Sequence, residues 1–319
     1  MDIFSIIKNR INQSLEMLGK NYYPSIIQIG ITNRCNLQCI ICSRKFTDRD
    51  MSFKEFKYVI DQFSEIKKIS IVGQGENFLN KDFFNMLEYA KLKGNFVEFY
   101  DNFCLLNDKI IDKLINIKPD IVWASLDGAT KETYELIRVG SNFEIVLNNI
   151  KSLIELKEIK KINYPKINFN YVVNKYNFKE ILKFIELIGS IKKNEEVLIS
   201  FVNTMSIHID LRNIYSDDNQ QKIILQANQR AKEIGVLLEW RNFPRIKMSI
   251  QNCEMWTRPC IMPNGDFFPC CVINGQAPFG NVFQENFKEL WNKNNYKNFR
   301  KNIAIGKVPL FCKKCEILL

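Results

Sequence analysis

The strongest constraint on the fold is an alternation of short apolar runs with helical segments, which starts near residue 24 and continues for about 210 residues. The apolar runs are nearly continuous, as expected for a parallel sheet that is covered on both faces. They span residues 25–32, 68–73, 96–100, 121–127, 167–173 and 197–202. Helical segments are predicted at 53–66, 81–93, 108–117, 130–139, 143–159, 177–189 and 217–234. This order predicts an α/β fold, a partial (β/α)6 barrel, with the chemistry on the loops that follow the strands.

The pattern changes after residue 245, where Pro, Cys, Asn and Gly become denser. We therefore predict an N-terminal amphipathic helix at 1–22, a partial barrel at 23–245 and a small domain at 246–319. Apolar residues flank Asn264-Gly265-Asp266 in this last part, which predicts a β-hairpin. The apolar residues of the first helix recur at helical spacing, which we interpret as packing on the barrel rather than on a membrane surface.

The expected compartment decides whether the ten cysteines form disulfides or act as reduced thiols. Lys8 and Arg10 interrupt the N-terminal segment, so it does not read as a signal peptide, and no run approaches the roughly 18 apolar residues of a membrane span. We expect a cytoplasmic protein with reduced thiols, where clustered cysteines indicate metal binding or catalysis. The net charge of +10 favours anionic partners. The aromatic residues are not interleaved with basic ones, so the sequence does not favour nucleic-acid binding.

Cys35, Cys39 and Cys42 form a C-x3-C-x2-C motif directly after the first predicted strand. One loop can thus present three thiolates to a single iron–sulfur cluster and leave one iron open to another ligand. A zinc site is the alternative, although zinc would need a fourth ligand. The chain has a single histidine, His208, so multi-histidine metal sites are excluded.

This motif and its context resemble the radical S-adenosylmethionine enzymes. Gly75 and Glu76, in GQGEN after the second strand, are similar to the family's GGEP-type segment, which contacts the methionine amino group of the cofactor; Asn77 stands where proline is usual. Ser125, in SLDG after the fourth strand, is similar to a serine near the cofactor ribose. The resemblance implies that Arg138 reaches the cofactor carboxylate. The alternatives are a plain glycine turn at Gly75 and a surface position for Arg138.

The C-terminal cysteines resemble the SPASM/twitch extension of this family, which holds an auxiliary iron–sulfur cluster. The spacing of the shorter twitch form implies four ligands for a single auxiliary [4Fe–4S] cluster: Cys253, Cys271, Cys312 and Cys315. The fuller form of the motif instead matches Cys260 and Cys270, which remain the alternate ligands. A zinc ribbon that only stabilises this small domain is the competing interpretation.

The resemblance implies cofactors and a reaction class: a [4Fe–4S] cluster, S-adenosylmethionine, a 5′-deoxyadenosyl radical that abstracts hydrogen from the substrate, and an auxiliary cluster as electron acceptor. A flavodoxin- or ferredoxin-type protein would donate the first electron. Oxidation of an alcohol also needs a base, for which the sequence offers His208 and, more weakly, Asp210 and Asp217.

The substrate is not readable from the sequence. Because only 34 residues precede Cys35, too few for a leader-binding domain, we favour a small polar substrate such as a sugar, an aminocyclitol or a nucleotide-linked molecule. The first alternative is a maturase that modifies a peptide or protein side chain. The second is a non-catalytic iron–sulfur or zinc-binding protein.

Overall fold

The computed structural model describes residues 11, 14, 23–42, 48–63, 66–203, 210–211, 216–241, 243, 249–253, 255–271, 277–313 and 315. Of the predicted N-terminal helix at 1–22, only Ile11 and Ser14 belong to this set. Among the described residues, no helix is both long and apolar enough to cross a membrane.

Strands and helices alternate as predicted. The strands are β1 (Ile26–Ile29), β2 (Lys68–Ile71), β3 (Phe96–Asp101), β4 (Ile121–Ser125), β5 (Lys166–Val173), β6 (Leu198–Asn203), β7 (Leu237–Arg241), β8 (Cys260–Ile261), β9 (Asp266–Phe268) and β10 (Gly280–Asn281). The α-helices are α2 (Phe53–Asp61), α3 (Phe83–Leu92), α4 (Asp108–Ile117), α5 (Lys131–Ile137), α6 (Phe143–Ile159), α7 (Ile181–Ile191), α8 (Asp217–Ile234), α9 (Phe287–Asn292) and α10 (Asn294–Ala304).

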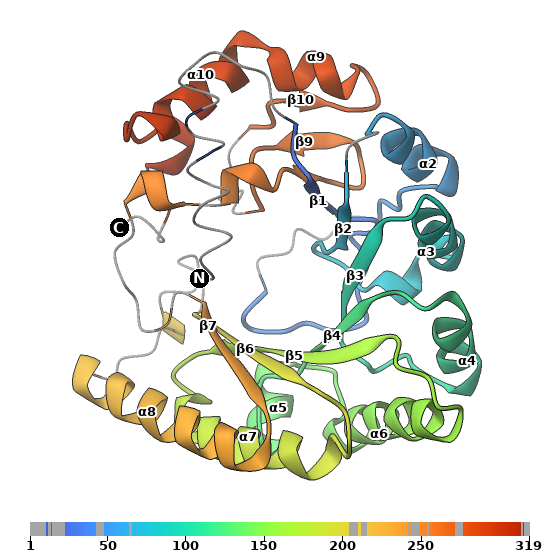
Figure 1. The fold of residues 1–319 in the computed structure, drawn as a ribbon, viewed down its shortest axis with the longest axis vertical. Helices are drawn as coiled ribbons and strands as arrows, with labels where there is room; N and C mark the ends of the chain where they lie inside the picture. Colours follow the sequence, from blue (N-terminus) through green and yellow to red (C-terminus); the bar gives the residue numbers. More distant parts are fainter. Residues whose placement is uncertain are drawn as a thin grey trace.

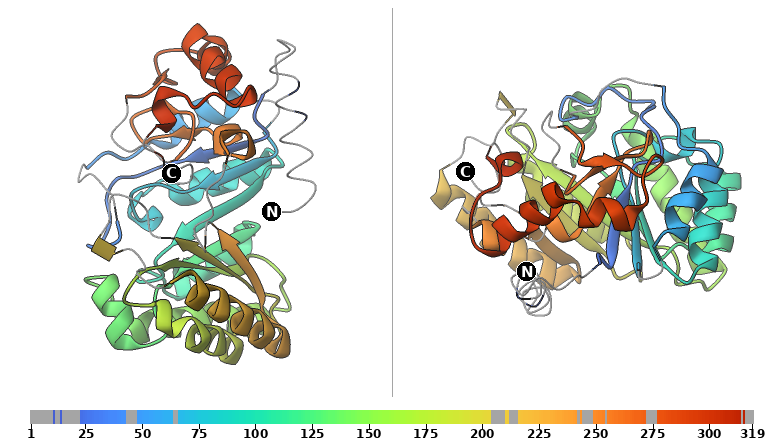
Figure 2. Two further views of the ribbon diagram at one scale, coloured as in Figure 1. Left: turned by 90° about the vertical axis from the view of Figure 1, so that its left-hand side faces the viewer. Right: turned by 90° about the horizontal axis from the view of Figure 1, so that it is seen from above.

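The sheet is an opened barrel. Its strand order is β10-β9-β8-β1-β2-β3-β4-β5-β6-β7, and β1 to β7 are parallel neighbours in chain order. The strands curve into an arc with the helices on its outer side (Figure 1), and the turned views show the same layering (Figure 2). The predicted partial barrel is thereby confirmed, together with its six strands.

The seventh parallel strand, β7, was not predicted. Its sequence LLEWR alternates apolar with charged residues, unlike the continuous apolar runs of the other strands. The strand pairs on one side only, with β6, so one edge and the inner side stay open to polar groups. The criterion of continuous apolar runs therefore missed it.

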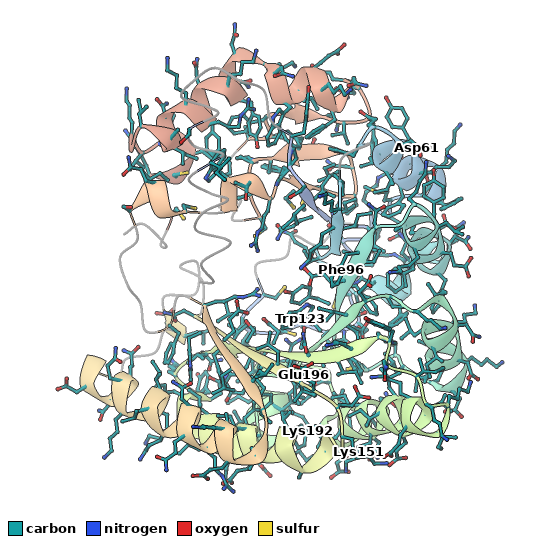
Figure 3. The ribbon with its side chains drawn as sticks, viewed as in Figure 1. Asp61, Phe96, Trp123, Lys151, Lys192 and Glu196 are labelled. Atoms are coloured by element: carbon teal, nitrogen blue, oxygen red, sulfur yellow. The ribbon has the colours of Figure 1, made fainter. Side chains whose placement is uncertain are left out.

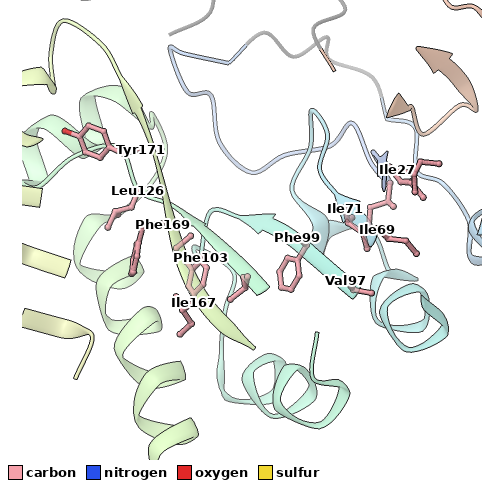
Figure 4. Packing of buried hydrophobic residues seen from close by; sticks show 14 of the residues in the cluster. Ile27, Ile69, Ile71, Val97, Phe99, Phe103, Leu126, Ile167, Phe169 and Tyr171 are labelled. Atoms are coloured by element: carbon pink, nitrogen blue, oxygen red, sulfur yellow. The ribbon is translucent and has the colours of Figure 1, made fainter. Parts of the chain in front are cut away.

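The core lies between the sheet and the outer helices. Val97 and Phe99 of β3, and Ile167 and Phe169 of β5, are fully buried on the helix side (Figure 4). Burial of each such side chain contributes about 1.5–3 kcal/mol. Successive strand residues point to opposite faces, so Glu98 and the other alternate residues face the concave side, which we call the inner face.

Local signals fix where the helices begin. Ser52 caps α2 in a capping box with Glu55, and Asn107 caps α4 through its side chain. Thr130 accepts a hydrogen bond from the Thr133 amide at 3.3 Å and starts α5 directly after the fourth strand. These caps set the lengths of the loops that follow β1, β3 and β4.

The predicted C-terminal hairpin is present and joins the barrel sheet. Strands β8 and β9 pair antiparallel around Gly265, whose φ of +85° favours glycine. Strand β8 also pairs with β1, with Gln28 opposite Cys260 and Ile29 opposite Ile261. The C-terminal cysteines are therefore attached to the same sheet edge as the strand that leads to Cys35.

Candidate active site

The first cysteine loop leaves the carboxyl end of β1 and is held by two neighbours. The Arg34 guanidinium pairs with Asp50 and also donates to the carbonyl of Leu79. The Gln38 and Ile40 amides donate to the carbonyls of Val139 and Ile137 at 2.9 Å, so the loop runs beside the end of α5. The fold thus fixes the path of the loop before any cofactor is considered.

The three thiols of this loop influence one another. Burial raises the pKa of Cys39 to about 11; the positive charge of Arg138 lowers it, and the charges of Asp127, Cys42 and Cys35 raise it. Cys35 and Cys39 are partly exposed and Cys42 is exposed. Three neighbouring thiols that solvent can reach fit the ligand set of a cluster with one open iron. Within the described ranges, no group of three or more His, Cys, Asp or Glu side chains is arranged so that it could hold a single metal ion.

The predicted Gly75–Glu76 segment packs directly on this loop. The Glu76 amide donates to the Arg34 carbonyl at 2.7 Å. A Cβ atom at Gly75 would lie 2.5 Å from the carbonyl oxygens of both Thr32 and Arg34, so only glycine fits. Asn77 is buried and donates to the Tyr100 carbonyl at 2.6 Å, a bond that the proline usual at this position could not make.

Glu76 meets a second carboxyl group, Asp101 at the end of β3. The side chains are 3% and 2% exposed. Glu76 Oε2 accepts from the Asn102 amide at 3.0 Å and Asp101 Oδ1 from the Phe103 amide at 2.6 Å. Burial, followed by the charge of Glu76, raises the pKa of Asp101 well above its usual range. A hydrogen bond between the two carboxyl groups also raises this pKa, and apart from it Glu76 Oε1 and Asp101 Oδ2 receive no hydrogen bond within the described structure.

The two carboxyl groups match the ammonium group of S-adenosylmethionine. The methionine ammonium of that cofactor carries three N–H donors and a positive charge, which two buried carboxyl groups without donors can accept. Asn102 also donates to the Asn36 side chain at 2.8 Å, which ties the end of β3 to the cysteine loop. The residues present therefore fit the cofactor.

Ser125 and Arg138 lie on the same side of the barrel. Ser125 ends β4 and is partly exposed. The buried Arg138 guanidinium donates to Asp127 Oδ2 at 2.7 and 2.6 Å and acts electrostatically on Cys39. Arg138 is thus not a surface residue of the helix but a buried partner of Asp127, beside the cysteine loop.

The C-terminal cysteines form a second connected group. Burial raises the pKa of Cys312 to about 12, with further contributions from the charges of Cys253 and Cys315. Cys271 interacts with Cys315 and receives a hydrogen bond from the Gln28 side chain. Cys260 is buried and interacts with Cys271. The four predicted ligands therefore act electrostatically on one another as a connected set, which also includes the alternate ligand Cys260. Their role as cluster ligands stays a prediction.

The remaining predicted residues are the candidate bases and the alternate ligand Cys270. His208 lies outside the described residues, as does the Asp217 side chain, and Asp210 is exposed. The alternate ligand Cys270 is buried. Sequence reasoning missed Asp101 and Gln28. Asp101 could have been found as an acidic residue at a predicted strand end, whereas nothing in the sequence singles out Gln28.

Comparison with known proteins agrees with this geometry. Residues 29–188 match the radical SAM superfamily and residues 253–316 match an iron–sulfur cluster-binding domain, SPASM. The chain belongs to the radical SAM superfamily. Its cofactors are accordingly a [4Fe–4S] cluster, S-adenosylmethionine and an auxiliary cluster.

Relatives of several activities share this architecture. The chain is 26% identical to an AdoMet-dependent heme synthase of Methanosarcina barkeri, over 94% of this chain and 90% of the relative. It is 31% identical to a protein named "Probable GTP 3′,8-cyclase" of Methanocaldococcus jannaschii, over 77% and 79%. The crystal structure of Streptococcus suis SuiB bound to S-adenosylmethionine has a TM-score of 0.74 at 18% identity, covering 96% of this chain and 73% of SuiB. SuiB was also solved with its precursor peptide SuiA.

Proposed function

We propose that this chain is a radical S-adenosylmethionine oxidoreductase that oxidises a small polar molecule. The bound cofactors would supply a 5′-deoxyadenosyl radical that takes a hydrogen atom from the substrate, and an iron–sulfur acceptor for the electron that remains. The residues of the chain would hold these groups, orient the substrate and exclude water.

One observation supports the oxidoreductase assignment above others: strand β8 pairs with β1, so that Cys260 lies opposite Gln28. Ile27 and Ile29 of β1 are buried on the helix side, so Gln28 faces the inner side of the sheet. The C-terminal cysteines are thereby attached to the strand that leads into the first cysteine loop. An electron acceptor there would be near a substrate radical formed at the barrel mouth.

The proposed cofactor site uses the residues identified above. Glu76, with Asp101 beside it, would accept the methionine ammonium, and Gly75 would let the backbone approach. Ser125 would lie near the ribose, and Arg138 would act on the carboxylate from its place beside Cys39. Cluster ligands would be Cys35, Cys39 and Cys42 at the first site and Cys253, Cys271, Cys312 and Cys315 at the second, with Cys260 and Cys270 as alternates.

The substrate class rests on the inner face of the barrel, where Ser, Asn and paired charged side chains prevail. Such a lining suits a sugar, an aminocyclitol or a nucleotide-linked molecule. Modification of a peptide side chain is the second candidate, because SuiB, whose fold this chain shares, was solved with a precursor peptide. A partner chain would then present the peptide.

The proposal also includes an electron donor, a compartment and a domain division. We expect a flavodoxin- or ferredoxin-type electron donor and a cytoplasmic setting that keeps the thiols reduced. We retain the division into 1–22, 23–245 and 246–319, although β8 continues the barrel sheet. His208 stays a candidate base.

Anaerobic reconstitution tests the proposed function. Iron and sulfide per chain are measured together with reductant-dependent release of 5′-deoxyadenosine. About eight irons with release of the nucleoside are expected for two clusters. About four irons with release would remove the auxiliary cluster, and bound zinc without release would contradict the radical chemistry.

A further inference from the structure

A row of polar side chains crosses the inner face of four neighbouring strands. Ser125 of β4 lies opposite Asn170 of β5, Asn170 opposite Ser200 of β6, and Ser200 opposite Glu239 of β7. Neighbouring strands are about 4.8 Å apart, so the row extends over about 14 Å. The interior of a closed (β/α)8 barrel is usually filled with Val, Ile and Leu. Packing of the barrel interior therefore does not explain this polar row.

Ser200 is the least satisfied member of the row. Its side chain is fully buried, and within the described residues its Oγ has no hydrogen-bond partner. A buried hydroxyl without a partner costs about 1–3 kcal/mol. Asn170 and Glu239, on either side of Ser200, are partly exposed. A ligand that contacts both of them would therefore cover Ser200 and come within reach of its hydroxyl group. A hydroxyl group of such a ligand could donate to Ser200 or accept from it.

Glu239 is held in place by Arg241, two residues along the same strand. Arg241 Nε and Nη2 both donate to Glu239 Oε2, at 2.7 Å each, which leaves Oε1 open to another group. The two side chains are 40% and 39% exposed. A carboxylate oriented by an arginine, with one oxygen that no described residue contacts, is a suitable acceptor for the proton of a hydroxyl group.

Arg241 is in turn fixed by aromatic side chains from the opposite part of the arc. Its guanidinium lies 5.6 Å from the ring centre of Trp123 and hydrogen-bonds the Tyr100 hydroxyl. The two rings stack at 5.5 Å with an interplanar angle of 7°. Trp123 lies on the inner side of the sheet (Figure 3). The contact of Arg241 therefore joins β7 to β3 and β4 across the concave side, and Glu239 lies in the same polar row as Ser125 at the end of β4.

The charges on this face cancel in pairs. Arg241 pairs with Glu239, and Lys68 pairs with the buried Glu98 at 3.0 Å. Glu98 also accepts from the Trp123 indole at 3.0 Å. An anionic or cationic substrate would have to compete with one of these pairs, whereas a neutral molecule would not.

We propose that Asn170, Ser200 and Glu239 form the substrate site, that its ligand is a neutral molecule with several hydroxyl groups, and that Glu239 accepts the hydroxyl proton during oxidation. This inference rests on the proposed function. The substrate carbon–hydrogen bond would give its hydrogen atom to the radical that bound S-adenosylmethionine supplies, Glu239 would accept the hydroxyl proton, and an iron–sulfur acceptor would take the remaining electron. The C–O single bond becomes a carbonyl, so atoms and electrons balance. Arg241 is a positioning residue in this scheme.

Deuterium transfer tests the site even while the substrate is unidentified. Cells that contain the chain are grown in D2O, and their extract is separated into neutral, anionic and cationic small molecules and peptides. Each fraction is added to the reconstituted holoenzyme with S-adenosylmethionine and reductant. The mass of the 5′-deoxyadenosine then reports which fraction gave up deuterium, and hydrazine trapping reports new carbonyl groups.

We expect deuterated 5′-deoxyadenosine from the neutral fraction. Ser200→Ala should lower this transfer by about 5- to 50-fold at limiting extract, as for a lost hydrogen bond. Glu239→Gln should keep the deuterium transfer and lower carbonyl formation by about 10²-fold or more. Glu233→Gln, which changes an exposed residue of α8, is the matched control and should behave as wild type.

Each other result contradicts a defined part of the proposal. Deuterium from the anionic, cationic or peptide fraction alone would overturn the substrate class, as would unlabelled 5′-deoxyadenosine with every fraction. Unchanged carbonyl formation by Glu239→Gln would overturn its role as proton acceptor. Absence of 5′-deoxyadenosine under all conditions would instead contradict the proposed function, on which the inference rests.

Discussion

The two groups of cysteines in this chain differ in what surrounds them. The loop of Cys35, Cys39 and Cys42 is partly exposed and is bordered by charged groups, among them Glu76 and Arg138. In the C-terminal group Cys253 and Cys312 are buried, whereas Cys315 is partly exposed and Cys271 is exposed, and aromatic rings lie next to Cys312. Phe311, the neighbour of Cys312, contacts Phe279 and Phe299 with ring centres 5.8 and 6.0 Å apart.

This difference separates two uses of thiolate ligands. An iron that must bind a further ligand needs access and polar groups that recognise that ligand, and the first loop has both. A cluster that only accepts an electron is served by complete thiolate ligation in a packed environment. Thiolate-bound iron can therefore serve two purposes. In the proposed function, the cluster after β1 generates the radical, and the cluster beside β1 accepts an electron.

Removing the first ligand set should have the largest effect. Replacement of Cys35, Cys39 and Cys42 by Ala is expected to lower 5′-deoxyadenosine release by more than about 1,000-fold while about four irons remain bound. Chromatographic assay of the nucleoside, with iron analysis, measures both. Retained release would show that the open iron is held elsewhere.

Removing half of the second ligand set should give the opposite pattern. Cys312→Ala with Cys315→Ala is expected to lose about four irons and to destabilise the C-terminal region, because cluster binding contributes to its folding. Release of 5′-deoxyadenosine should persist. If the iron content stayed the same, the auxiliary ligands would have to be other cysteines.

In the proposed function, Glu76 and Asp101 recognise the cofactor in the first region. Glu76→Gln or Asp101→Asn should weaken S-adenosylmethionine binding about 10- to 100-fold, as for a charge-assisted hydrogen bond. Calorimetric titration of the reconstituted protein measures this, with the exposed Glu88→Gln as control. An analogue without the amino group should bind both variants as it binds wild type. Equal weakening for this analogue would mean that the carboxyl groups act only on the fold.

The smallest expected effect concerns the aromatic packing of the second region. Phe311→Leu removes two edge-to-face ring contacts and should lower the free energy of unfolding by about 1 kcal/mol. Denaturant unfolding under anaerobic conditions measures it. Nucleoside release should not change. A loss of release would mean that the two regions are coupled more tightly than their separate surroundings suggest.

The sequence predicted the parallel barrel well because its strands are local apolar runs. Helices α4 and α8 have the predicted bounds, and the ends of the six predicted strands lie within three residues of those observed. Strand β7 was missed because it mixes Glu239 and Arg241 with apolar residues. The pairing of β8 with β1 joins residues 28 and 260, and no local pattern carries information on such a contact.

The candidate site was predictable where a motif is continuous in sequence. The cysteines, Gly75 and Glu76 belong to such motifs. The partnership of Glu76 with Asp101, the burial of Arg138 against Asp127 and the contact of Gln28 with Cys271 arise from three-dimensional packing. These contacts join segments that are distant in the sequence, and only the curved arrangement of the sheet brings them together.

The most direct test of the central claim is electron paramagnetic resonance of the reduced, reconstituted protein during titration with S-adenosylmethionine. We predict two cluster signals, of which one shifts on titration and is missing from the Cys35, Cys39 and Cys42 variant. The other should stay unchanged and be missing from the Cys312 and Cys315 variant. A shift of both signals, of neither, or of the C-terminal signal alone would contradict the division of roles between the two cysteine groups.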